Sequence, residues 1–109
     1  MIYQIIFLES AEYDLKELRN HIIQNFSLKI WKISYSKIKT AITNLKEFPY
    51  SGHVPAELEK LNIDQYRQVI SGMNRIIYEV RQNTIYIHII VDSRQDLKHL
   101  LTKRILRSI

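Results

Sequence analysis

Arginine, glutamate and histidine recur through the second half of the chain, and together these side chains are suited to phosphate chemistry. The most informative are Arg67, Arg75, Glu79 and His88. Arginine can bind a phosphodiester and stabilise the negative charge that develops during its cleavage. A glutamate or histidine beside the phosphate can serve as general acid or base. These four residues are the candidate catalytic residues if the protein is a nuclease, and this chemistry requires no metal ion.

Three predicted strands carry these residues. Segments 66–70, 75–80 and 85–91 are rich in β-branched and aromatic residues and are separated by hairpin-length turns, which predicts an antiparallel meander. Alternation along each strand divides the side chains between two faces of the sheet. Those expected to pack against helices are Tyr66, Ile70, Ile76, Tyr78, Val80, Ile85, Ile87, Ile89 and Val91. Those expected on the opposite, open face are Arg67, Val69, Arg75, Ile77, Glu79, Arg81, Tyr86, His88, Ile90 and Asp92.

The open face also has an interpretation without chemistry. Arginine and glutamate on neighbouring strands can simply pair across a solvated sheet surface, and each such pair contributes ~0.2–1 kcal/mol. The residue types alone do not separate these two interpretations.

The rest of the chain predicts the elements around the meander. A buried strand over residues 2–8 precedes an apolar helical stripe that begins after Ser10, and a second helix begins after Ser27 and ends near residue 48. Ser93 and Asp96 are spaced as a capping box before a final helix. The predicted class is α+β, with the order β-α-α-β-β-β-α, in which an N-terminal α-helical hairpin covers one face of an antiparallel sheet. Residues 1–109 are expected to form a single domain.

Composition excludes several kinds of site. The 109 residues contain no cysteine and only two glycines, which excludes disulfide frameworks, zinc-thiolate sites and glycine-rich nucleotide loops. The four histidines have no metal-ligand spacing, so neither a metal nor a cofactor is expected. The apolar runs are short and no signal peptide is apparent, so we expect a cytoplasmic protein that does not enter a membrane.

Charge is unevenly distributed along the chain. Residues 67–109 hold eight Lys and Arg against three acidic residues and account for the whole net charge of +5. A basic half of this kind favours binding to nucleic acid or to an acidic protein. The residues expected to form this contact are Arg81, Arg94, Lys98, Lys103 and Arg104. A lysine series on the second helix either follows a nucleic-acid backbone or forms a solvated helix face; it comprises Lys29, Lys32, Lys37, Lys39 and Lys46.

Several short motifs, taken in order, resemble the RelE/ParE superfamily of bacterial toxins. Ser10-Ala11-Glu12-Tyr13-Asp14-Leu15 resembles its A-x-x-D-L helix start, and Phe48-Pro49-Tyr50-Ser51-Gly52 resembles its P-x-x-G loop. Tyr66-Arg67-Gln68-Val69, Asn74-Arg75-Ile76-Ile77-Tyr78-Glu79-Val80 and Arg94-Gln95-Asp96-Leu97 leading to Arg104 resemble its strand and C-terminal motifs. The resemblance covers essentially the whole chain and rests on the order of motifs that are individually weak.

The resemblance implies a growth-arresting toxin held silent by a cognate antitoxin in a hetero-oligomer. RelE-like members cut ribosome-bound mRNA with basic sheet residues and a histidine or tyrosine near the C-terminus, whereas ParE-like members poison DNA gyrase. Here Asp92 replaces the frequent histidine after the last strand, and no tyrosine follows Tyr86. The resemblance therefore slightly favours a gyrase poison. The alternatives are an mRNA endonuclease, with His88 as an unorthodox catalytic residue, and an inactive module that only binds its antitoxin.

Overall fold

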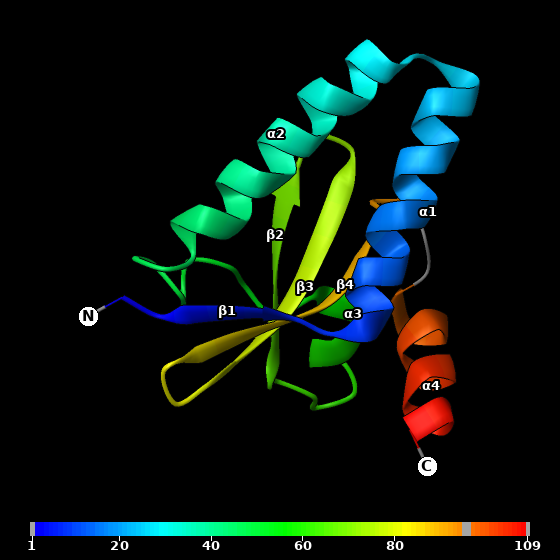
Figure 1. Cartoon of the computed structure of the whole chain (residues 1–109). Helices are drawn as coiled ribbons and strands as arrows, with labels where there is room; N and C mark the ends of the chain where they lie inside the picture. Colours follow the sequence, from blue (N-terminus) through cyan, green and yellow to red (C-terminus); the bar gives the residue numbers. More distant parts are fainter. Residues whose placement is uncertain (1, 95–96, 109) are drawn as a thin grey trace.

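The computed structural model describes residues 2–94 and 97–108, with the backbone alone for residues 98, 101 and 105–108. Four helices and four strands follow one another in the predicted order, with one short helix added (Figure 1). They are β1 (Gln4–Phe7), α1 (Glu9–Asn25), α2 (Leu28–Asn44), α3 (Ala56–Glu59), β2 (Tyr66–Ser71), β3 (Asn74–Arg81), β4 (Thr84–Asp92) and α4 (Leu97–Ser108). None of the helices so described is long and apolar enough to cross a membrane.

The strands form one sheet in the order β1-β4-β3-β2. The predicted antiparallel meander of β2, β3 and β4 is confirmed. β1 lies at the far edge and runs parallel to β4, which is possible because a long stretch of chain separates the two strands. The α+β class is therefore confirmed, with a parallel pair added to the antiparallel sheet.

The helical hairpin is also confirmed. The Ser27 side chain caps α2 by accepting a hydrogen bond of 3.1 Å from the Ile30 amide, as predicted. The apolar stripes of α1 and α2 pack on one face of the sheet, and the hairpin tip extends past the ends of the strands (Figure 1). This core consists of Ala11, Ile38, Ile42, Leu45, Ile76, Tyr78, Ile85, Ile87 and Ile90.

The opposite face of the sheet was expected to be open, and this prediction is wrong. A second core of Leu58, Ile77, Ile89, Val91 and Leu97 joins this face to α3 and α4. Helix α3 is only four residues long, and a helix of one turn has too few positions to show a helical period. The part of the sheet face beside α3 is therefore covered rather than exposed to solvent.

A β-bulge in β4 changes which side chains share a face. Ile77 pairs with Ile89 while Tyr78 pairs with Ile87, so His88 is an extra residue without a partner on β3. Alternation therefore reverses after His88, and Ile90 packs against the hairpin whereas Ile89 packs against α3 and α4. The predicted faces of Ile89, Ile90 and Val91 are accordingly wrong.

The faces predicted for β2 are also reversed. Ser71 pairs with Asn74 across a two-residue turn, which places Val69 opposite Ile76 and Ile70 opposite Arg75. The side chains of Val69 and Arg67 thus lie on the hairpin side. Those of Ile70 and Tyr66 lie on the other side, where Tyr66 packs against the second core and Ile70 is exposed.

Ser10 does not cap α1 as predicted. The helix begins at Glu9, and the residue at its N-cap, Leu8, makes no side-chain capping bond. The Ser10 hydroxyl instead donates to the His88 carbonyl at 3.2 Å, because β1 has ended there and leaves that edge of β4 without a neighbouring strand. The predicted capping box of Ser93 and Asp96 includes residue 96, which lies outside the described residues.

Candidate functional site

The bulge places His88 beside Glu79, as the sequence predicted for these two residues. The His88 Nε2 and Glu79 Oε1 atoms lie 3.0 Å apart across β3 and β4. The Tyr66 ring meets the His88 ring edge to face at 5.1 Å between centroids. A carboxylate only accepts hydrogen bonds, so Nε2 donates in this contact and Nδ1 is the ring atom left to accept a proton.

Burial is the largest influence on His88 and lowers its pKa below the ordinary value of 6.5. The hydrogen bond and charge of Glu79 act in the opposite direction, while Arg81 and Arg104 lower the pKa further. The imidazole is therefore neutral near pH 7. A neutral histidine held by a carboxylate can serve as a general base, which is the chemistry an acid–base catalyst requires.

Arg81 completes a small polar cluster with His88 and Glu79. Its guanidinium lies 3.1 Å from Glu79 Oε1 and stacks over the Tyr86 ring at 4.4 Å from the centroid. The Arg81 side chain is 57% exposed, so a ligand can reach it from solvent. We call His88, Glu79 and Arg81 the bulge cluster.

Arg75 lies on the same sheet face but is bound inside the fold. It donates to both Glu57 carboxylate oxygens, at 2.7 and 2.9 Å, and its Nε donates to Gln68 at 2.7 Å. This contact with Arg75 lowers the pKa of Glu57 below its ordinary value of 4.5. The Arg75 side chain is only 9% exposed, and Glu57 of α3 and Gln68 of β2 together occupy its hydrogen-bonding groups.

Arg67 lies on the opposite face of the sheet from Arg75. It donates to the Gly52 carbonyl at 2.7 Å and stacks over the Tyr50 ring at 5.1 Å from the centroid. The Tyr78 hydroxyl binds the same loop, since it donates to the Pro49 carbonyl at 2.8 Å and accepts from the Gly52 amide. The P-x-x-G motif is thus a loop anchored to the sheet. The prediction that Arg67 and Arg75 share one open face is wrong, because the pairing of β2 with β3 places them on opposite faces.

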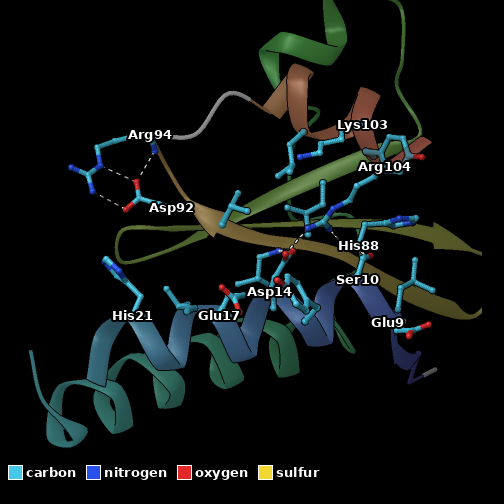
Figure 2. A pocket seen from close by; sticks show the side chains of 18 residues that line it. Glu9, Ser10, Asp14, Glu17, His21, His88, Asp92, Arg94, Lys103 and Arg104 are labelled. Atoms are coloured by element: carbon cyan, nitrogen blue, oxygen red, sulfur yellow. Dashed lines mark hydrogen bonds and ion pairs between the residues drawn. The ribbon is translucent and has the colours of Figure 1, made fainter. Parts of the chain in front are cut away.

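A groove of about 1290 Å³ runs between α1, the uncovered edge of β4, and α4 (Figure 2). Arg104 crosses it from α4, donates to the His88 carbonyl at 2.8 Å and forms a short ion pair with Asp14 on α1. The other Asp14 oxygen accepts from the Ile90 amide at 3.0 Å. Asp14 and Ser10 therefore satisfy the backbone groups that β1 leaves unpaired on β4.

Sequence reasoning missed this role of Asp14. The residue is buried with its side chain on the inner stripe of α1, next to Ala11 and Leu18. A carboxylate at an apolar stripe position requires a partner, since burying an unpaired charge is costly. The position of Asp14 on the apolar stripe therefore indicated that it has a buried partner. The sequence could not identify that partner, because Arg104 on α4 is 90 residues away.

Two more of the predicted contact residues, Arg94 and Lys103, line the same groove. Arg94 is largely exposed and binds the Asp92 carboxylate at 2.9 and 3.0 Å, and this contact lowers the pKa of Asp92. Lys103 is exposed on α4 at the mouth of the groove (Figure 2). The side chain of Lys98 lies outside the described part of the chain. Among the described residues, no group of histidine and acidic side chains is arranged to hold a metal ion.

Comparison with solved structures finds this fold in chains from two toxin-antitoxin systems. A chain from the "Chromosomal ParDE TA system from P. aeruginosa" matches with a TM-score of 0.69 and 14% identity over 84% of this chain and 96% of that chain. A chain from the RelBE2 toxin-antitoxin complex of Mycobacterium tuberculosis matches with a TM-score of 0.59 and 17% identity over 84% and 99%. No curated protein matches the chain.

The sequence itself identifies the family. Residues 5–97 match the model of the ParE toxin of type II toxin-antitoxin systems, parDE. The chain therefore belongs to the ParE toxin family, and it is a toxin of a type II toxin-antitoxin system. The predicted membership of the RelE/ParE superfamily is confirmed.

Proposed function

We propose that this toxin arrests growth by poisoning DNA gyrase and does not cleave RNA. The observation that carries the proposal is the position of the two arginines that a sheet-based nuclease would need. Arg67 and Arg75 lie on opposite faces, and each is bound within the fold, to a loop carbonyl and to Glu57 respectively. One phosphodiester therefore cannot contact both side chains without rearrangement of the sheet.

The family and the end of β4 support the same target. The family model that matches is that of the ParE toxin. The resemblance of this chain to ParE-like members implies gyrase as the target. Asp92 stands where nuclease members frequently have a histidine, and Arg94 holds it as an ion pair. A carboxylate whose pKa is lowered by an ion pair is ionised at neutral pH and is therefore a poor proton donor.

Induction of the toxin in growing cells tests the target. Gyrase poisoning should produce double-strand DNA breaks while mRNA stays intact, and His88→Ala should remain toxic because a poison transfers no proton. Ribosome-dependent mRNA cuts with intact DNA would overturn the proposal.

The mRNA endonuclease is the second candidate, and the bulge cluster is the observation that favours it. A neutral His88 held by Glu79 beside an exposed Arg81 is a plausible acid–base site. If it is catalytic, His88→Ala and Glu79→Gln should each lower the cleavage rate by ~100-fold or more. Retention of full toxicity in both variants would eliminate this candidate.

We further propose that a cognate antitoxin binds this toxin in a hetero-oligomer in the cytoplasm. Both similar solved structures come from toxin-antitoxin systems, and residues 67–109 carry the net positive charge that an acidic partner would meet. The toxin alone should stop growth, and co-expression with its cognate antitoxin should restore it. Unchanged growth at high expression of the toxin alone would favour the inactive, antitoxin-binding module.

A further inference from the structure

The exposed apolar residues of the molecule are concentrated around the start of α2. Five large apolar side chains within ten residues are each 40–68% exposed; they are Phe26, Leu28, Ile30, Ile33 and Tyr35. Exposed apolar side chains that share one face of an element mark a surface that another molecule covers. Isolated exposed apolar residues occur elsewhere, but the described chain has no comparable run.

Two of these side chains lie on one face of α2 together with two lysines. Lys29, Ile33 and Lys37 follow one another at four-residue spacings, and Ile30 lies three residues before Ile33 and seven before Lys37, so the four share the helix side opposite the buried Trp31. Ile30 and Ile33 are 43% and 45% exposed. We call these four residues the outer α2 face.

This face carries positive charge that the fold does not neutralise. Helix α2 contains four lysines and no acidic residue, and neither Lys29 nor Lys37 forms an ion pair with a described residue. In contrast, Arg75, Arg81 and Arg94 each have a carboxylate partner within the chain. An acidic partner would therefore gain more from the outer α2 face than from these three paired arginines.

The apolar component distinguishes the class of partner. Nucleic-acid backbones are bound by cations and hydrogen-bond donors, whereas exposed isoleucines between lysines match the mixed apolar and charged surface of a protein. The hairpin tip also extends beyond the sheet, so it can reach a large partner (Figure 1). The groove beside α4 is lined mainly by α1, β4 and α4, and none of the described residues that line it belongs to α2; Figure 2 shows its lining residues.

We infer that the outer α2 face docks on an acidic, partly apolar protein surface of DNA gyrase. The inference rests on the proposed function, because a poison without chemistry acts only through the surface that holds its target. The isoleucines would supply apolar burial, and the lysines would steer and orient the encounter.

Affinity for purified gyrase, measured by surface plasmon resonance, tests this surface. Ile30→Ser/Ile33→Ser and Lys29→Glu/Lys37→Glu should each weaken gyrase binding at least tenfold and reduce toxicity, with affinity for the antitoxin unchanged. Lys32→Glu/Lys39→Glu is the matched control, since it makes the same charge change on another side of α2, at a spacing of seven residues where Lys29 and Lys37 are eight apart. It should bind gyrase within about threefold of the wild type at 150 mM salt, where surface charges are screened over ~8 Å.

Circular dichroism and thermal unfolding would verify that the variants fold, which is expected because all the substituted side chains are exposed. Wild-type affinity for gyrase in both test variants would overturn the inference. Loss of antitoxin binding with gyrase binding intact would also overturn it, by assigning the face to the antitoxin. A wild-type toxin that does not bind gyrase would overturn the proposed function itself, an outcome distinct from failure of the docking surface.

Discussion

At the scale of single residues, the arginines that most resemble catalytic groups have structural partners. Arg75 joins β3 to α3 through Glu57, and Arg67 fixes the loop at Gly52. Their residue types and positions were evident from the sequence, but their partners were not. Glu57 lies in a stretch without helical periodicity, so nothing in the sequence placed its carboxylate beside Arg75.

The structural role of Arg75 leads to a double-variant prediction. Arg75→Met alone should destabilise the fold by about 3 kcal/mol, because it leaves the Glu57 carboxylate without its partner. Glu57→Met/Arg75→Met should recover most of this loss, since an apolar pair of similar volume commonly replaces an ion pair at little cost. Urea unfolding measures both values.

Toxicity of the same double variant separates structure from catalysis. A gyrase poison that needs Arg75 only for folding should remain toxic in Glu57→Met/Arg75→Met. If the double variant is stable but inactive, Arg75 has a direct role in the activity.

The lowered pKa of His88 predicts how stability depends on pH. Below pH 6.5 the unfolded chain binds a proton at His88 more readily than the folded chain does, so the unfolded state is favoured. The contribution of His88 is therefore complete above pH 6.5 and is lost as the pH falls toward the folded-state pKa. Glu57 has a lowered pKa, and its contribution is lost only below 4.5, in a separate range.

Urea midpoints at pH 8.0 and 5.5, compared between the wild type and His88→Asn, check this dependence. The wild type should lose more stability than the variant between the two pH values. An equal loss in both proteins would show that His88 does not titrate with folding.

At the scale of elements, the sequence predicted the longer helices and the antiparallel meander but could not determine the register of the strands. The stripes of α1 and α2 and the strands of the meander were predicted because each repeats over several residues. The bulge at His88 adds one residue to β4 without any local signature, and it reverses the faces of Ile89 and Ile90. The candidate site was therefore predicted in part: Glu79, Arg81 and His88 do meet, whereas Arg67 lies on the other face.

The anchored loop between α2 and α3 provides a prediction at this scale. A Cβ atom at Gly52 would lie 2.5 Å from the Gln68 carbonyl oxygen and 2.6 Å from the Tyr78 hydroxyl. Gly52→Ala should therefore destabilise the fold by ~1–3 kcal/mol, as overpacking typically does. Gly72→Asn is the control, because a side chain at this turn meets no atom within 4 Å and asparagine tolerates its φ of +59°.

Thermal unfolding compares the two glycine variants. Gly52→Ala should melt several degrees below the wild type, and Gly72→Asn should melt close to it. Equal melting of all three proteins would mean that the loop can move away from β2 without cost.

At the scale of the whole molecule, paired and uncompensated charges lie in different places. Arg75, Arg81 and Arg94 have carboxylate partners, while the lysines of α2 have none among the described residues. Net charge along the chain predicted a basic second half but could not reveal which cations are neutralised, because the pairs join distant segments such as α1 and α4. This distribution favours a protein that acts by binding, consistent with the proposed gyrase poison.

A reconstituted reaction with purified components tests this account most directly. The toxin is incubated with gyrase and supercoiled plasmid in one reaction, and with ribosomes translating a defined mRNA in another. The account predicts that linear plasmid accumulates in a gyrase-dependent manner, that the mRNA stays intact, and that His88→Ala behaves as the wild type. Ribosome-dependent cleavage of the mRNA that disappears in His88→Ala, with no linear plasmid, would contradict it.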